Sequence, residues 1–212
     1  LAAAGLGTIG IIDDDKVELS NLQRQIIHKS NMIGAHKTDS AKETILSINP
    51  NIKVITYKKR FSFSNAEDIV SKYDIVADGS DNFGTRFLVN DVCFLTKKTL
   101  VSAAILRFEG QISTYSAYKD SNCCYRCLWP SPPPKGLIAS CGEAGVFGAL
   151  AGSIGSIQAI EVLKEILGIG KSLNNFLMIF DTLSSEMRKV KINKDITCQL
   201  CGPKPNIVSI KK

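Results

Sequence analysis

Four cysteines in two pairs give the clearest chemical signal in this sequence of 212 residues. Two residues separate Cys124 from Cys127, and two residues separate Cys198 from Cys201. Two such pairs are typical of four thiolates around a tetrahedral zinc ion, a structural site that leaves no coordination position open. Cys123 fits this spacing less well than Cys124 does. Two redox dithiols are the alternative interpretation of the pairs.

The other two cysteines lie in different surroundings. Cys93 falls within an apolar stretch of helical character, so we expect it in the core. Cys141 follows a proline-rich loop at residues 128–140 and precedes a glycine-rich helical segment. A thiol near a helix N-terminus has a lowered pKa and can act as a nucleophile, and a packed structural thiol is the alternative.

A second group of residues has the composition of a nucleotide site. Asp13 follows an apolar run, at the place where nucleotide-binding folds hold a ribose hydroxyl. The polar run 20–25, which includes Arg24, and then Lys37 supply cations for phosphate oxygens. Asp81 follows a later apolar run, where a carboxylate can hold Mg²⁺. We therefore predict phosphoryl chemistry at one carboxyl edge of a sheet, with solvated loops as the alternative.

The elements that must position these residues alternate along the chain. We expect strands at 8–12, 52–57, 73–77 and 99–103, and helices at 38–48, from Ser64 through Lys72, and from Asp81 to about Leu95. This alternation predicts an α/β fold with a doubly wound, Rossmann-like, mostly parallel sheet. Runs at about 111–117, 176–181 and 187–192 predict an antiparallel extension, and the cysteines predict a zinc-pinned C-terminal lobe.

Composition places the chain among ordinary globular proteins. Hydrophobic residues make up 44% and charged residues 22%, which excludes disordered, collagen-like and coiled-coil classes. The formal net charge is +6, and seven basic residues face one acid from Arg188 onward. No aromatic residue follows Phe180, so a solvated tail is favoured over a nucleic-acid surface. A basic face for an acidic protein partner stays open.

One uncharged stretch needs a test for membrane insertion. Residues 144–160 carry no charge and lie between Glu143 and Glu161. The stretch is at the short limit for a membrane span, and its glycines suit close helix packing. We expect a buried core helix in a soluble, cytoplasmic protein without a membrane partner.

The order of these motifs resembles the ubiquitin-activating-enzyme-like adenylyltransferases, the family of the MoeB, ThiF and HesA proteins, with MoeB the most similar. The matching motifs are Ile12-Asp13-Asp14-Asp15-x-Val17-x-Leu19-Ser20-Asn21-Leu22-Gln23-Arg24-Gln25, Gly34-x-x-Lys37, Ser80-Asp81-Asn82, Glu109-Gly110-Gln111, Cys124-Tyr125-Arg126-Cys127, Cys141-x-Glu143-Ala144-Gly145-Val146 and Cys198-x-x-Cys201-Gly202. The resemblance identifies residues 1–212 as a single ThiF-type domain that ends in a zinc-binding turn and basic tail at 198–212.

The resemblance implies ATP-dependent adenylylation of the C-terminal glycine of a ubiquitin-like sulfur-carrier protein. The expected carrier is the MoaD-like small subunit of molybdopterin synthase, and the ThiS-like carrier of thiamine synthesis is the alternative. An inactive, scaffold-type remnant is a further alternative. A nicotinamide-dependent dehydrogenase would also use Asp13, but it has no need of Arg24 and Lys37 at a terminal phosphate.

The resemblance also assigns roles to residues. Asp13 is assigned to the ribose, Asn21, Arg24 and Lys37 to the phosphates, and Asp81 to Mg²⁺. Ser20, Leu22, Gln23 and Asn82 are assigned to the nucleotide site without a more specific role. The catalytic set is Arg24, Lys37 and Asp81, with Cys141 as a thioester or persulfide residue, and Zn²⁺ is assigned to Cys124, Cys127, Cys198 and Cys201.

Family members carry a further strand and a Gly-x-Gly-x-x-Gly loop before the helix whose end residues 1–5 resemble. We therefore expect a chain truncated at its N-terminus, without the phosphate-binding loop. The resemblance implies a homodimer. It also implies a separate protein as sulfur donor, because no rhodanese-like domain follows Gly202, and it implies no nucleic-acid partner.

Overall fold

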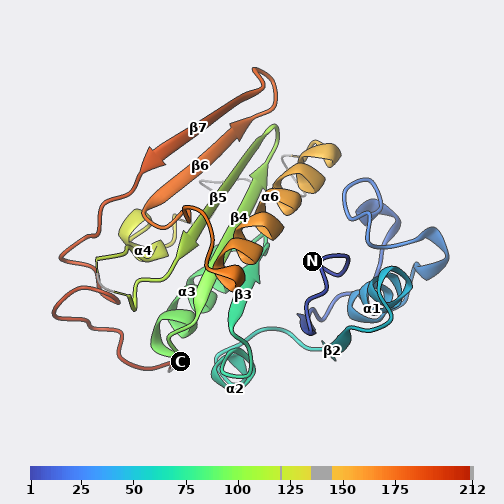
Figure 1. Ribbon diagram of the computed structural model, residues 1–212, viewed down its shortest axis with the longest axis horizontal. Helices are drawn as coiled ribbons and strands as arrows, with labels where there is room; N and C mark the ends of the chain where they lie inside the picture. Colours follow the sequence, from blue (N-terminus) through green and yellow to red (C-terminus); the bar gives the residue numbers. More distant parts are fainter. Residues whose placement is uncertain (120, 135–144, 211–212) are drawn as a thin grey trace. The chain divides into compact units, whose positions relative to one another are not determined.

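The computed structural model describes residues 1–119, 121–134 and 145–210. The chain forms two compact units, Leu1–Phe61 and Ser62–Lys212. Figure 1 shows the elements of both, and each unit is described by itself.

The first unit is built on two parallel strands. Strand β1 (Thr8–Ile12) pairs with β2 (Lys53–Tyr57), and helix α1 (Lys37–Ile48) lies between them in the sequence. Both strands are rich in β-branched residues, which favour extended backbone. The helix ends at Ile48 because Pro50 disfavours helical geometry for Asn49, the residue before it. The predicted strands and helix of this unit are confirmed to within one residue.

Residues 1–5 form turns in place of the expected end of a helix. The Ala4 and Gly5 amides donate to the Leu1 and Ala2 carbonyls at 3.1 and 3.0 Å, which is a three-residue spacing. Gly5 has a φ of +82°, the left-handed backbone that a glycine at a helix C-terminus also adopts. Ala2 is buried, and it packs in a small core with Ile45, Ile52 and Val54.

The second unit is a five-stranded sheet with the order β3-β4-β5-β6-β7. Its strands are β3 (Ile75–Asp78), β4 (Thr99–Leu106), β5 (Glu109–Tyr115), β6 (Phe176–Asp181) and β7 (Glu186–Lys191). The β3–β4 pairing is parallel, and the other three pairings are antiparallel. The predicted Rossmann-like arrangement with an antiparallel extension is confirmed, and β5, β6 and β7 are the three strands of that extension.

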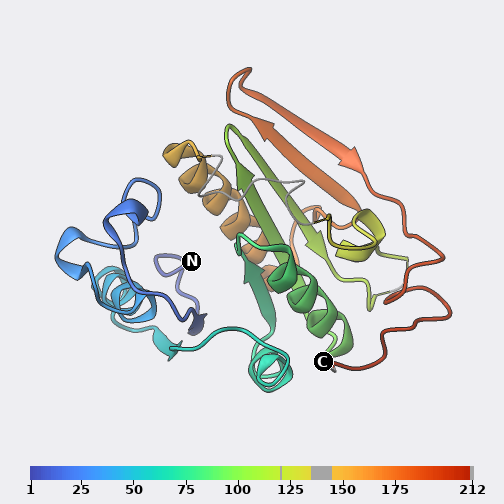
Figure 2. The same cartoon turned by 180° about the vertical axis from the view of Figure 1, so that it is seen from behind.

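Helices cover both faces of this sheet. Figures 1 and 2 show α6 (Gly148–Leu167) on one face and α3 (Phe83–Leu95) on the other. The short helices are α2 (Ala66–Val70) and α4 (Tyr125–Leu128). The predicted helix from Ser64 through Lys72 is shorter in the structure, and Asn65 rather than Ser64 is the residue before its first helical position.

Helix α6 contributes one face to the core, as expected of a core helix, and its other face is exposed. Leu150, Ile154 and Val162 are buried, whereas Gly152 and Ile160 are exposed. The amphipathic pattern follows the helical repeat. No helix in the described part of the chain combines the length and apolar character that a membrane span requires.

Gly110 allows α6 to lie directly on β5. A Cβ atom at this position would overlap the Ile154 side chain and would come within 3.1 Å of Leu150 Cδ1. Ile154 and Leu150 are almost fully buried, so they have little room to move. The glycine in the Glu109-Gly110-Gln111 motif therefore has a packing role.

We predict that Gly110→Ala destabilises the protein by about 1–3 kcal/mol, because the added methyl group overpacks the α6–β5 contact. The matched control is Gly152→Ala on the exposed face of α6, where a Cβ atom meets no other atom within 4 Å. We expect this control to stabilise the helix by about 0.5–1 kcal/mol. Urea unfolding measures both, and equal effects of the two substitutions would contradict the packing argument.

Candidate functional site

The predicted ribose and phosphate residues of the first unit lie around the carboxyl end of β1. Asp13 follows β1, and its Oδ1 accepts a hydrogen bond from the Asp15 amide at 2.8 Å. Lys37 is the first residue of α1, and its Nζ lies 2.8 Å from Asp15 Oδ2. Only 13% of the Lys37 side chain is exposed, against 66% for Asp15. The ammonium group is thus held in a fixed place beside the end of the strand.

The polar run 20–25 folds into turns that use several of its own polar groups. Asn21 is buried, and its Oδ1 accepts from the Glu18 amide at 3.1 Å. Arg24 donates through Nη1 to the Ser20 carbonyl at 3.0 Å. Leu22 is half-buried and Gln23 is exposed. Asn21 therefore shapes the turn, and Arg24 keeps the rest of its guanidinium for other acceptors.

His28 is a residue of this region that sequence reasoning missed. Its Nδ1 lies 3.0 Å from Ser40 Oγ on α1. Partial burial lowers the pKa of His28, the nearby Lys37 lowers it further, and Asp13 opposes both effects. The histidine is therefore held neutral beside the predicted phosphate residues. The contact between His28 and Ser40 was not predictable, because 12 residues separate the two side chains and His28 belongs to no sequence motif.

In the second unit, Asp81 and Asn82 lie in the loop between β3 and α3. Asp81 is exposed, and its Oδ1 accepts weakly from Asn82 Nδ2 at 3.5 Å. Asn82 caps α3, because its Oδ1 accepts from the Thr85 amide at 2.9 Å. The predicted Mg²⁺ residue thus presents a free carboxylate, whereas its neighbour has a structural role in the helix cap.

The loop that carries Asp81 is fixed from both sides. Asp78 is buried, and its two oxygens accept from the Ser80 amide at 3.0 Å and the Ser102 hydroxyl at 3.3 Å. Burial raises the pKa of Asp78, and these hydrogen bonds partly offset the rise. Arg86 on α3 donates to the Ser80 carbonyl through both Nε and Nη2, at 2.8 and 2.6 Å.

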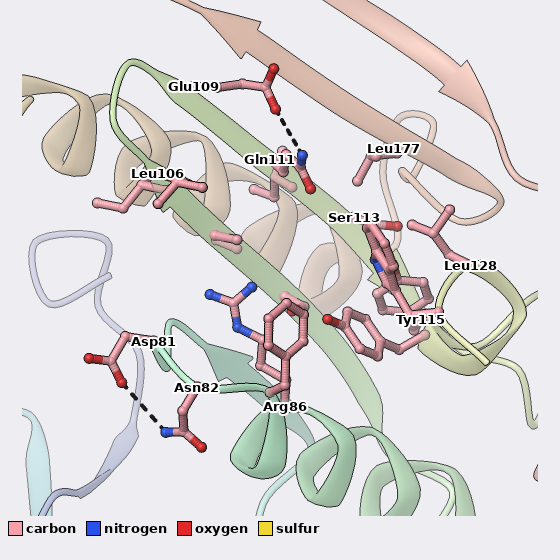
Figure 3. A pocket seen from close by; sticks show the side chains of 18 of the residues that line it. Asp81, Asn82, Arg86, Leu106, Glu109, Gln111, Ser113, Tyr115, Leu128 and Leu177 are labelled. Atoms are coloured by element: carbon pink, nitrogen blue, oxygen red, sulfur yellow. Dashed lines mark hydrogen bonds between the residues drawn. The ribbon is translucent and has the colours of Figure 1, made fainter. Parts of the chain in front are cut away.

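This loop borders a pocket of about 760 Å³ within the second unit. Figure 3 shows side chains from α3, β4, β5 and the α4 region around it. The lining includes Asp81, Arg86, Gln111, Tyr115, Tyr125 and Trp129. A cavity of this size, walled by aromatic groups with a few polar groups, is typical of a binding site for a small molecule or an extended chain segment. Sequence motifs indicated Asp81 and Asn82 but not the aromatic walls.

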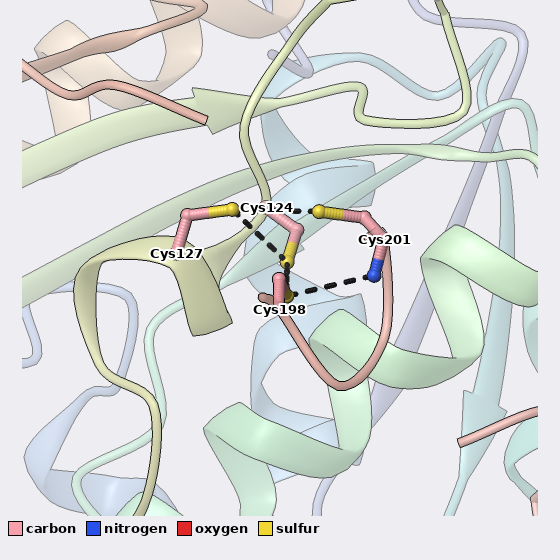
Figure 4. Close-up of side chains that lie close together, drawn as sticks. All are labelled: Cys124, Cys127, Cys198 and Cys201. Carbon is pink, nitrogen blue, oxygen red and sulfur yellow. Dashed lines mark hydrogen bonds between the residues drawn. The ribbon is translucent and has the colours of Figure 1, made fainter. Parts of the chain in front are cut away.

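The four paired cysteines come together as predicted. Sγ–Sγ distances are 3.9 Å for Cys124–Cys127, 3.6 Å for Cys124–Cys198 and 3.4 Å for Cys127–Cys201. All four sulfurs lie within 4.8 Å of one another (Figure 4), and none is in a disulfide. A tetrahedral site with Zn–S bonds of about 2.3 Å has sulfur–sulfur edges of about 3.8 Å. The cluster therefore has the dimensions of a zinc site.

The remaining cysteines separate clearly from this cluster. Cys123 is fully buried but is not part of the group that could hold a metal, so the preference for Cys124 is confirmed. Cys93 is 2% exposed in α3, as expected for a core residue, and burial raises the pKa of its thiol. Cys141 lies outside the described residues.

Polar contacts attach the first cysteine pair to α3. Asn90 Oδ1 accepts from the Tyr125 amide at 2.9 Å. The Arg126 guanidinium binds both oxygens of Asp91 at 2.7 Å, and the side chains of this pair are 14% and 10% exposed. The guanidinium also lies over the Phe87 ring, 4.6 Å from its centre. The sequence gave no indication of this ion pair, because 35 residues separate its members.

A model of the ThiF family matches residues 1–200 of this chain. The chain belongs to the ThiF family. The sulfur carrier protein adenylyltransferase of Thermus thermophilus is 42% identical over 208 residues, which are 97% of this chain and 77% of that protein. The adenylyltransferase and sulfurtransferase MOCS3 of Dictyostelium discoideum is 45% identical over 212 residues, 99% of this chain and 49% of that protein.

A second MOCS3 protein, from Culex quinquefasciatus, is 43% identical over 99% of this chain, which spans 48% of that relative. The chain therefore spans about half the length of these MOCS3 relatives. Among solved structures, Escherichia coli MccB with MccA-N7isoASN has a TM-score of 0.81, with 20% identity over 95% of this chain and 62% of MccB. MccB with ATP has a TM-score of 0.79, with 21% identity over 95% of this chain and 60% of MccB. These two structures share the ThiF fold of this chain.

We predict that Asp91→Asn destabilises the second unit by about 3 kcal/mol, because it leaves the Arg126 charge buried without its partner. The fluorescence of Trp129, the one tryptophan of the sequence, reports unfolding of this unit in urea. The matched control is Asp68→Asn in the exposed Asp68–Lys72 pair, whose side chains are 71% and 53% exposed. The control should cost less than about 1 kcal/mol. A comparable loss in both variants would show that the Asp91 pair has no special role.

Proposed function

We propose that this chain catalyses ATP-dependent adenylylation of the C-terminal glycine of a ubiquitin-like sulfur-carrier protein. The observation that carries the proposal is the 42% identity, over 97% of the chain, to a protein named sulfur carrier protein adenylyltransferase. In this reaction a carboxylate oxygen of the carrier attacks the α-phosphorus of MgATP. The bond to the bridging oxygen breaks, pyrophosphate leaves, and the product is an acyl adenylate.

The residues of the first unit supply the nucleotide contacts in this proposal. Asp13, at the end of β1, accepts from the ribose hydroxyls. Arg24 and Lys37 bind phosphate oxygens, because the described residues place no carboxylate within 4.0 Å of Arg24 and the Lys37 ammonium is already positioned by Asp15. Asn21 holds the turn in shape, and Ser20, Leu22 and Gln23 complete the segment that borders the phosphates.

Asp81 binds the magnesium ion of MgATP in this proposal. Its carboxylate is exposed, and the described residues place no cation within 4.0 Å of it. Carboxylate oxygens are the protein ligands that Mg²⁺ prefers beside substrate phosphates. The Asn82 side chain supports this group from the first turn of α3. Magnesium neutralises charge on the phosphates during the attack.

The choice of carrier extends this proposal. We favour the MoaD-like small subunit of molybdopterin synthase, with the ThiS-like thiamine carrier second and an inactive scaffold as the third possibility. The two units together form one ThiF-type domain in the proposal, since the family match runs through both. We further propose that the protein works as a homodimer in the cytoplasm with a separate sulfur donor. Cys141 is the candidate for a thioester or persulfide.

We also propose that Cys124, Cys127, Cys198 and Cys201 hold a structural Zn²⁺. The sulfur–sulfur spacings support this assignment, and so does the absence of a disulfide among the six described cysteines. Zinc would link the α4 turn to the segment 198–202, which are distant in sequence, and it would leave no position open for catalysis.

We predict that Asp81→Asn lowers ATP–pyrophosphate exchange at least about 100-fold while the fold stays intact, because the amide does not hold the magnesium charge. The exchange assay uses a Gly-Gly carrier from each pathway in turn, so it also identifies the carrier. The matched control is Asp74→Asn, an exposed aspartate just before the other end of β3. Exchange that survives Asp81→Asn would remove Asp81 from the proposed site, and no exchange with either carrier would favour the scaffold alternative.

We predict that the purified protein contains about one zinc ion per chain and that Cys124→Ala abolishes this binding and lowers the melting temperature. Elemental analysis and thermal melting measure the two effects. Cys123→Ala is the matched control, because the neighbouring cysteine is buried but outside the cluster. This control should keep its zinc. Full zinc content in Cys124→Ala would show that the assignment of the ligands is wrong.

A further inference from the structure

Arg86 is a half-buried cation that lines the pocket of the second unit. Two of its donors, Nε and Nη2, go to the same acceptor, the Ser80 carbonyl. The described residues place no carboxylate oxygen within 4.0 Å of its guanidinium. Its positive charge is therefore fixed in position without a carboxylate in direct contact.

Arg126, on α4, is an arginine of the same unit that does form an ion pair with a carboxylate. Its guanidinium binds both oxygens of Asp91 through Nε and Nη2, so a carboxylate balances its charge. Arg86 uses the same two nitrogens on a neutral carbonyl. Asp78 interacts electrostatically with Arg86, but it is buried and both of its oxygens already accept from Ser80 and Ser102. A partly desolvated charge without a partner is costly, so Arg86 is suited to an anion that enters the pocket.

The other groups in the pocket restrict the kind of anion. Aromatic and aliphatic side chains form much of the wall, among them Phe83, Tyr125 and Trp129. Glu109 also lines the pocket, and it accepts from Gln111 Nε2 at 2.8 Å. A polyphosphate carries several negative charges and needs several cations. Besides Arg86, the pocket is lined by the exposed Arg107 and by the acids Asp81, Glu109 and Asp181. This lining disfavours an anion with several charges, and one fixed guanidinium matches a group with a single negative charge, such as a carboxylate.

We propose that Arg86 binds the terminal carboxylate of the substrate in this pocket. The inference rests on the proposed adenylylation and adds a substrate-binding residue to it. Figure 3 shows the guanidinium among the pocket side chains, on the same side as Asp81 and Asn82. Because Nε and Nη2 are held by Ser80, the remaining Nη1 group is oriented before the substrate arrives. A carboxylate fixed in this way keeps its second oxygen available for attack on phosphorus.

The test compares two forms of one extended peptide that ends in Gly-Gly, the free acid and the C-terminal amide. Trp129 lines the pocket and is the sole tryptophan, so its fluorescence reports binding of either form. We expect the unmodified chain to bind the acid at least about tenfold more tightly than the amide, because a charge-assisted hydrogen bond is lost in the amide. In Arg86→Gln the two forms should bind equally.

Two further variants separate binding from structure. Arg107→Gln removes the other arginine that lines the pocket, an exposed one, and it should keep the preference for the acid. Arg86→Lys keeps the charge without the two-donor contact to Ser80, and it should keep part of the preference. If Arg86→Gln does not fold, Arg86→Lys still tests the proposal, since a merely structural Arg86 would leave the acid-to-amide ratio of a folded variant unchanged.

Three results would overturn the proposal. The first is equal or undetectable binding of acid and amide to the unmodified chain, and the second is an acid preference that survives in Arg86→Gln. The third is weaker ATP binding in Arg86→Gln with unchanged peptide binding, which would assign Arg86 to phosphate. Pyrophosphate exchange is measured in parallel. Exchange without an acid preference removes only the role of Arg86, and an acid preference without exchange removes only the proposed adenylylation.

Discussion

The attachment of α4 to α3 is the contact on which both functional regions of the second unit depend. Asn90 accepts from the first amide of α4, and Asp91 binds the guanidinium of Arg126 with both oxygens. These groups are largely buried, so the contact fixes the turn more firmly than a surface pair does. The segment 124–129, which is α4 with its two capping residues, contributes Tyr125 and Trp129 to the pocket and Cys124 and Cys127 to the sulfur cluster. Pocket wall and cysteine cluster therefore share one short segment.

The parts of the molecule that local sequence determines were predictable. The strand and helix limits of the first unit follow from β-branched runs and from the proline after Asn49. The cysteine cluster follows from the two-residue spacing within each pair, because this spacing is typical of cysteines that bind one metal ion. Asn21 and Asn82 are less clear, because a short amide can cap a turn or bind a ligand with the same atoms. In this structure both side chains accept from backbone amides, which their spacing alone does not reveal.

The parts that depend on distant contacts were not predictable. Helix α6 has the pattern of an apolar helix, yet Glu161 is 3% exposed and accepts from Thr114, Leu173 and Lys164. No periodicity reveals that a carboxylate in this helix is buried with three donors. The same holds for Arg86, whose importance comes from what surrounds it in the pocket. A sequence shows that a charge is present, but it does not show which charges lack a partner after folding.

The position of strand β7 gives the basic residues near the end of the chain a role in solubility. It is the last strand of the sheet, its six residues are all exposed, and its outer edge has backbone groups without a neighbouring strand. An edge that no other described strand covers can pair with another sheet and start aggregation, and lysines are a common protection against it. Arg188, Lys189 and Lys191 lie on this strand, so two β7 edges that approach each other meet like charges. The surplus of positive charge thus keeps separate molecules apart where the sheet is open.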